Sequence, residues 1–167
     1  MQNTEKKPAL WKIILLAVLV IAMVVLLDWM HLKKTAKSRY NDLSNGARSV
    51  FLAAESYRED GNALPESGKI SGQEGFSGYL LTKAEQYVAE GDDYAVVSDD
   101  AGQIRYVLYA HGSIAKKYLT APPHSGDGED KDRMLRLLQT PVLWWTAVGV
   151  YYPAVISAAP AETTETH

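Results

Sequence analysis

The feature that most constrains this chain is an uninterrupted apolar run near its N-terminus. No polar side chain occurs from Ile13 to Leu27, and residues 9–12 extend the run upstream with Lys12 as the one charge. A helix from Trp11 to Trp29 rises roughly 27 Å, which fits a hydrocarbon layer of about 30 Å with an indole near each face. We therefore predict a transmembrane helix over residues 9–27. Its anchor residues are Trp11, Lys12, Ile13, Leu27 and Trp29.

A cleaved signal peptide and a buried core helix are the two alternatives to a membrane span. A cleaved signal peptide needs a small-residue cleavage site soon after the apolar run, but residues 28–34 (DWMHLKK) contain none. A buried core helix that is apolar on every side needs a larger protein to cover it. Basic residues lie on both sides of the run, at Lys6 and Lys7 before it and at Lys33 and Lys34 after it. The charges alone therefore leave the orientation open.

Residues 28–60 predict an amphipathic continuation of the same helix, because apolar positions recur at steps of three or four. The helix is expected to stop at Asp60-Gly61-Asn62, and Gly46 marks a place where it can bend. A coiled coil is the alternative for this half, although the stripe spans only about three and a half heptads. We expect one face to pack on a sheet. The residues of that face are Leu43, Ala47, Val50, Phe51, Ala54 and Tyr57.

The remainder, residues 61–159, predicts one α+β head domain. A glycine-containing loop (61–75) precedes an amphipathic helix from Ser77 to Glu90, and Gly91 is expected to cap that helix. The helix is expected to bury Leu80, Leu81, Ala84, Tyr87 and Val88. Residues 94–98 and 103–109 alternate as an antiparallel hairpin around a turn at 99–102, and half of its side chains need a cover.

The C-terminal part of the head contains a polar loop, a short helix and a long uncharged stretch. The helix is expected from Arg133 to Gln139. The stretch from Pro141 to Ala159 is rich in aromatic and β-branched residues and contains Gly149 and Pro153, which favours a strand over a second membrane span. Residues 160–167 are expected to be a disordered tail.

The sequence predicts neither an enzyme nor a cofactor. A net charge of −3 argues against a nucleic-acid partner, and the absence of cysteine excludes thiolate chemistry. The four histidines, at positions 31, 111, 124 and 167, show no ligand spacing, and Asp92, Asp93, Asp99 and Asp100 fit turns at one end of the hairpin. Weak calcium candidates occur in one acidic loop, where a solvated loop is the preferred interpretation. They are Asp127, Glu129, Asp130 and Asp132.

An apolar helix that continues into an amphipathic helix, a glycine-containing loop and then a hairpin resembles the type IV pilin-like superfamily, which includes pseudopilins. Residues 47–64 are similar to the solvent half of a pilin's first helix, and residues 94–109 and 148–153 to sheet strands of Gram-positive pilin-like proteins. Lys6-Lys7 matches the basic part of the processing motif. Pro8 replaces its glycine, and residues 9–27 lack its glutamate, which favours an uncleaved protein.

The resemblance implies a membrane-anchored structural or assembly subunit of a pilus or a type II secretion-like system. Residues 1–8 would then be cytoplasmic, and the head would lie outside the cell membrane. The expected partners are the lipid bilayer and other pilin-like subunits or assembly-platform proteins. The alternative is a single-pass extracytoplasmic binding or sensing module whose ligand is not identified by the sequence.

Overall fold

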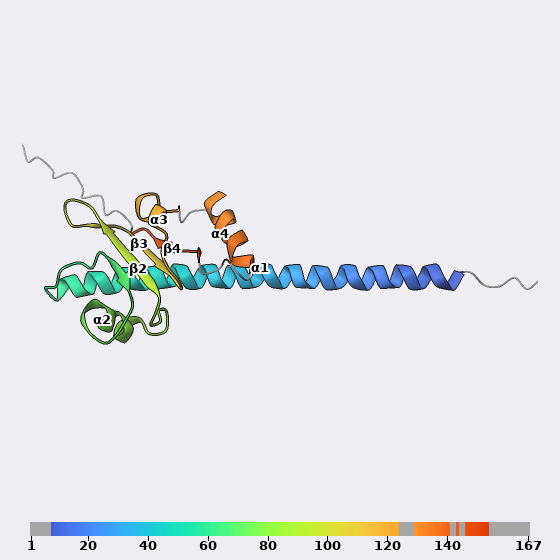
Figure 1. Cartoon of the computed structure of the whole chain (residues 1–167), viewed down its shortest axis with the longest axis horizontal. Helices are drawn as coiled ribbons and strands as arrows, with labels where there is room; N and C mark the ends of the chain where they lie inside the picture. The colour runs from blue at the N-terminus through green and yellow to red at the C-terminus, as the bar shows by residue number, and fades with distance from the viewer. Residues whose placement is uncertain (1–7, 124–128, 141–142, 144–145, 154–167) are drawn as a thin grey trace, which may run out of the picture.

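The computed structural model describes residues 8–123, 129–140, 143 and 146–153. Within these residues, one long helix carries a small head domain on its C-terminal half, while its N-terminal half extends alone (Figure 1). The elements in chain order are α1 (Pro8–Glu59), β1 (Ser67–Lys69), α2 (Gly75–Ala84), β2 (Asp93–Ser98), β3 (Ile104–Ala110), α3 (Lys116–Thr120), α4 (Glu129–Gln139) and β4 (Gly149–Tyr151). The predicted α+β fold, a long helix packed on a small antiparallel sheet, is confirmed.

Helix α1 continues from the apolar run into the amphipathic segment without a break. It ends just before Asp60, because Gly61 adopts a φ of +86° and its N–H bonds the Arg58 carbonyl at 2.9 Å. The helix also runs on through Gly46 (Figure 1). The Tyr109 ring packs directly on this glycine, since a Cβ atom there would lie 2.3 Å from Cδ1 of Tyr109. The helix therefore does not break at Gly46, and the glycine instead makes room for the Tyr109 ring.

The sheet has the order β1-β2-β3-β4, with every neighbouring pair antiparallel. The predicted hairpin is present as β2 and β3, with Tyr94 opposite Tyr109 and a bulge between Val97 and Ser98. Strand β1 lies within the segment expected to be a loop and pairs Ser67 with Ala95. None of its three residues is buried, so backbone hydrogen bonds rather than a hydrophobic pattern hold it on the sheet.

The uncharged C-terminal stretch contributes a strand, as expected, but a short one. Strand β4 pairs with β3, placing Gly149 opposite Tyr109 and Tyr151 opposite Val107. Residues 141–142, 144–145 and 154–159 of the expected strand and its flanks, and the tail 160–167, lie outside the described residues. Within the part of the chain that is described, α1 is the one helix long and apolar enough to cross a membrane.

Four expectations for the head helices need correction. Helix α2 ends at Ala84 rather than Glu90, since the N–H groups of Tyr87 and Val88 both turn back to the Ala84 carbonyl. The helical period stops there, so Tyr87 is 44% exposed instead of buried. Gly91 does not cap this helix, because its N–H bonds the Ile70 carbonyl at 2.8 Å. Helix α4 begins four residues before Arg133, and α3 was not foreseen.

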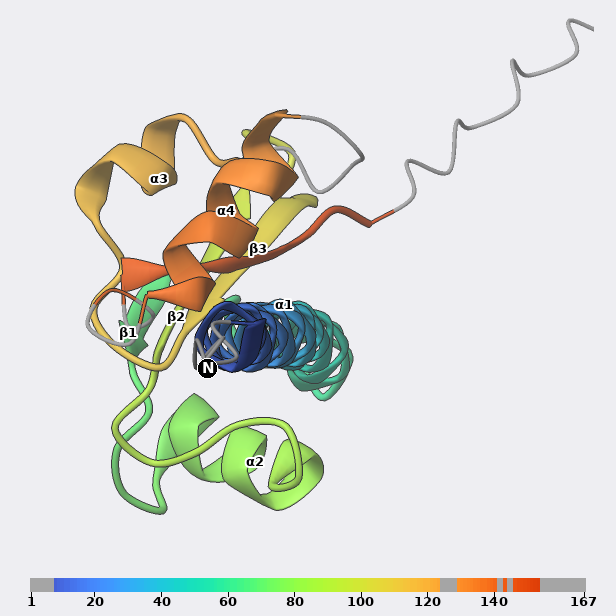
Figure 2. The same cartoon turned by 90° about the vertical axis from the view of Figure 1, so that its right-hand side faces the viewer.

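Both faces of the central strands are covered, which the half-apolar hairpin pattern did not predict. Five consecutive residues of β3, from Tyr106 to Ala110, are buried. Helix α1 lies against one face, and α3 lies beyond the other (Figure 2). On that second face the Tyr106 hydroxyl donates to the Leu119 carbonyl at 2.5 Å, and its ring lies 5.9 Å from that of Tyr152. The chain thus covers α1 with its own head, which leaves no need for a coiled-coil partner along this face.

Candidate functional site

The N-terminal half of α1 exposes a continuous apolar surface. Every large apolar side chain from Leu10 to Met30 is between 51% and 71% exposed, including Trp11 and Trp29 at the two ends. The most apolar window has a mean hydropathy of 3.0, and none of it is buried by the rest of the chain. The predicted anchor residues Trp11, Lys12, Ile13, Leu27 and Trp29 all belong to this exposed stretch. A helix of this kind is compatible with a membrane anchor and, near an N-terminus, with a signal sequence.

The predicted packing face of α1 lies against the head domain. Leu43, Ala47, Val50 and Ala54 are at most 1% exposed. Phe51 and Tyr57 are only partly buried: the Phe51 ring lies 5.0 Å from that of Tyr151, and the Tyr57 ring lies 5.4 Å from that of Phe76. Small residues bring the helix close to β4. A Cβ atom on Gly149 would lie 2.0 Å from the Leu43 carbonyl oxygen, so the two backbones touch. No sequence pattern indicated this role of Gly149.

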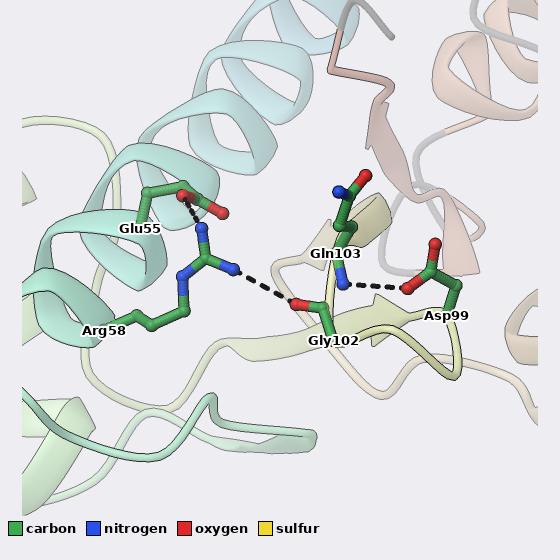
Figure 3. A network of polar contacts seen from close by, with 5 residues as sticks. All are labelled: Glu55, Arg58, Asp99, Gly102 and Gln103. Carbon is green, nitrogen blue, oxygen red and sulfur yellow. Dashed lines mark hydrogen bonds and ion pairs between the residues drawn. The ribbon is translucent and has the colours of Figure 1, made fainter. Parts of the chain in front are cut away.

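The tip of the hairpin is fastened to the end of α1 (Figure 3). Arg58 donates from Nη1 to the Gly102 carbonyl at 3.1 Å and from Nη2 to Glu55 at 2.5 Å. Within the turn, Asp99 accepts hydrogen bonds from the N–H groups of Ala101 and Gln103 at 3.0 and 2.8 Å. Asp99 therefore has the turn-forming role expected for it.

A buried polar cluster joins the other end of the hairpin. Asp92 is 6% exposed. Its Oδ2 accepts the Tyr109 hydroxyl, lies 3.3 Å from Nδ1 of His111 and accepts the Ala89 N–H at 3.0 Å. Burial alone would raise the pKa of Asp92, but these hydrogen bonds and the charge of His111 outweigh it, and the pKa falls below its ordinary value. Burial, together with the bond to Asp92, raises the pKa of Tyr109.

The Asp92 cluster was not predicted as a unit, although the hairpin register contains the signal for it. Asp93 pairs with Ala110, so the residues just outside this pair, Asp92 and His111, meet at one end of the ladder. The carboxylate is enclosed by donors, an arrangement that fixes the β2–β3 end against the preceding loop. The structure does not present Asp92 to solvent as a reactive group.

The weak calcium candidates do not form a described site. Asp127 and the side chain of Glu129 lie outside the described residues. Asp130 is half-buried, and Asp132 is exposed on α4. Among the described residues, no group of three or more histidine or acidic side chains is gathered closely enough to hold a metal ion.

The fold and this geometry define an α+β protein with one long helix whose N-terminal half is apolar and exposed. No protein-family model matches the chain, and neither the curated proteins nor the solved structures contain a significant match to it.

Proposed function

We propose that this chain is a pilin-like, membrane-anchored structural or assembly subunit of a type IV pilus or type II secretion-like system. Residues 9–27 would span the cell membrane once, with the head domain outside the cytoplasm. The observation that carries the proposal is the continuity of α1. From Leu10 to Met30 the helix exposes only apolar side chains apart from Lys12 and Asp28, and from Ala36 onward one face of it is buried against the head.

This continuity supports an assembly role for a mechanical reason. A helix without a break links the position of the head to the position of the apolar half, so contacts between neighbouring helices would also set the spacing of their heads. The apolar half has no partner within the described chain. Lipid or similar helices can cover it, and helices in membranes associate through close side-chain packing rather than through the hydrophobic effect.

A cysteine cross-linking experiment tests the assembly role, because the chain has no native thiol. Val18 and Val20 are 60% and 51% exposed and lie about 200° apart around the helix. In native membranes, subunits that pack on two sides should give a ladder of disulfide-linked species in the Val18→Cys/Val20→Cys variant. Each single variant should stop at dimers. The matched control places two cysteines at Ser98 and Asp100, on the exposed hairpin tip.

The second candidate is a single-pass extracytoplasmic binding or sensing module. It is favoured by one observation: residues 9–27 contain no glutamate, whereas the pilin-like processing motif carries one. The same experiment separates the two functions. A chain that remains monomeric with cysteines at every exposed helix position tested would refute the subunit proposal and favour the binding module.

A further inference from the structure

A basic groove lies where the head domain meets the exposed half of α1. It encloses about 710 Å³ between α1 and α4. Its charged lining comprises Lys33 and Lys37 from α1, and Lys131, Arg136 and Asp132 from α4. Four cations and one carboxylate give this lining a net charge of +3. The whole chain carries −3, so the groove opposes the overall charge of the protein.

The groove is built by contacts between segments far apart in the sequence. Met134 and Leu138 are buried, which seats one face of α4 on the core. Arg39 then donates from Nη1 to the Leu138 carbonyl at 3.1 Å, holding the C-terminal end of α4 against α1. Like charges from two helices are thereby gathered into one space. The cations outnumber the one carboxylate of the lining, Asp132, so the groove attracts a further anion.

The position of the groove along α1, close to the end of the apolar run, indicates where such an anion would come from. Lys33 lies six residues beyond Leu27, about 9 Å along the helix, and Lys37 about 15 Å. A bilayer of about 40–45 Å with a hydrocarbon core of about 30 Å has a headgroup layer of roughly 5–8 Å on each side. Helical side chains point back toward the N-terminus. The Lys33 ammonium accordingly lies 3.6 Å from the centre of the Trp29 ring, toward the headgroup layer, whereas Lys37 lies about one helical turn farther from that layer.

Figure 1 shows that α4 is the labelled head element nearest to the exposed half of α1. The groove therefore opens beside the end of the apolar surface. An arginine can bind a phosphate with two parallel hydrogen bonds, and lysines add compact positive charge around it. Juxtamembrane clusters of such residues bind anionic lipid surfaces.

We propose that the groove lined by Lys33, Lys37, Lys131 and Arg136 binds the phosphate of an anionic phospholipid headgroup in the leaflet next to the head domain. This inference rests on the membrane anchoring in the proposed function but not on assembly into a filament or secretion system. A bound lipid would neutralise the gathered cations and fix the height and tilt of the head above the bilayer.

The test uses the full chain in nanodiscs of phosphatidylcholine that contain a trace of spin-labelled phosphatidylglycerol or spin-labelled phosphatidylcholine. The ratio of the two immobilised fractions measures the preference for the anionic lipid. A cation near a membrane surface contributes about a fivefold preference, so Lys37→Gln/Arg136→Gln should lower the ratio by at least that factor. Asp132→Asn should raise it, a gain that a misfolded variant would not produce.

The matched control is Lys34→Gln/Arg48→Gln, which removes the same charge from exposed positions of α1 outside the groove. It should leave most of the preference intact. An equal loss in the groove and control variants would overturn the proposal in favour of general surface charge. So would the absence of any preference in the wild-type protein.

A second experiment distinguishes binding of a lipid phosphate from binding of soluble phosphate. Calorimetric titration of inorganic phosphate into phosphatidylcholine discs detects a soluble-anion site. Saturable phosphate binding that the groove variant loses, without a lipid preference, would overturn the lipid proposal. Discs that hold one copy do not depend on assembly, so this result is independent of the cross-linking ladder. A wild-type chain that fails to co-purify with the discs would refute the anchor itself.

Discussion

The contact between α1 and β4 makes Gly149 a stringent test of the helix–sheet architecture. In Gly149→Ala the new Cβ would lie 2.0 Å from the Leu43 carbonyl oxygen and 2.8 Å from the Ser44 nitrogen. Ordinary contacts between heavy atoms require about 3.5–4 Å. Both opposing atoms belong to the helix backbone, so no side-chain rotation relieves the clash. The helix and strand must instead separate by more than 1 Å.

That separation determines how far the free energy of unfolding is expected to fall. Overpacking a core typically costs about 1–3 kcal/mol, and a gap of about 0.5–1 Å forfeits a quarter to a half of the dispersion energy of each affected contact. The alanine recovers at most about 1 kcal/mol by restricting the unfolded chain. We expect a net loss of about 2–3 kcal/mol in the free energy of unfolding. For a head of this size the midpoint should fall by about 8–12 °C.

The assay is thermal unfolding of the full chain in detergent micelles, followed by near-ultraviolet circular dichroism. That signal reports the packing of tyrosine and tryptophan rings, whereas the far-ultraviolet signal is dominated by α1 itself. Gly68→Ala is the matched control, because it also lies in a strand, has no positive φ, and would place its Cβ 3.4 Å from the Tyr94 oxygen. It should change stability by less than about 0.5 kcal/mol. Equal midpoints for both variants would refute the contact between the two backbones.

Three further predictions use the same chain. Phe51→Ala should lower the free energy of unfolding in denaturant by about 2 kcal/mol, less than for a fully buried ring, because Phe51 is only partly covered by Tyr151. The control is Leu52→Ala at the neighbouring position, which is 55% exposed and should lose under about 1 kcal/mol. Equal losses would contradict the packing. The lowered pKa of Asp92 contributes stability that is present above the ordinary value of 3.8 and is lost as the pH falls through the lowered value. The thermal unfolding midpoint of Asp92→Asn should therefore be lower than that of the wild type at pH 7, and it should change less on acidification. Parallel plots of the two midpoints against pH would contradict the cluster. N-terminal sequencing of the membrane-bound protein should find its original start, whereas a start near Ala9 would indicate prepilin processing and a start beyond Asp28 would remove the anchor.

The sequence predicted the elements whose signals are local. The apolar run and the three-to-four residue stripe of α1 lie within one helix, and the β2–β3 hairpin is specified by alternation around the turn at Asp99. Strand β1 escaped prediction because Ser67, Gly68 and Lys69 are all exposed and carry no pattern. Its position depends on pairing with β2, which is a property of the folded sheet.

The sites were harder to predict than the elements, because they join segments far apart in the chain. Arg39 and Leu138 are 99 residues apart, and no local pattern brings α4 to α1 to form the basic groove. From the sequence, Gly46 indicated a possible bend and Gly149 only disfavoured a helix; their packing roles depend on their partners, Tyr109 and Leu43. The Asp92 cluster is the intermediate case, since its register follows from the hairpin, but its burial does not.

The final prediction concerns the side of the membrane on which each part of the chain lies. Strand β4 pairs with β3, so Tyr152 belongs to the same head as the hairpin. Thr163 lies outside the described residues, but the ten positions from 154 to 163 are too few for a second span, which needs about 20 residues. Single cysteines at Ser98 and Thr163 should therefore react equally with a membrane-impermeant thiol reagent in intact cells. A cysteine at Asn3 should be protected until the membrane is permeabilised, and the wild-type chain supplies a background without thiols. Protection of Thr163 alone would place it across the membrane from the hairpin, while labelling of Asn3 with protection of Ser98 would invert the proposed orientation.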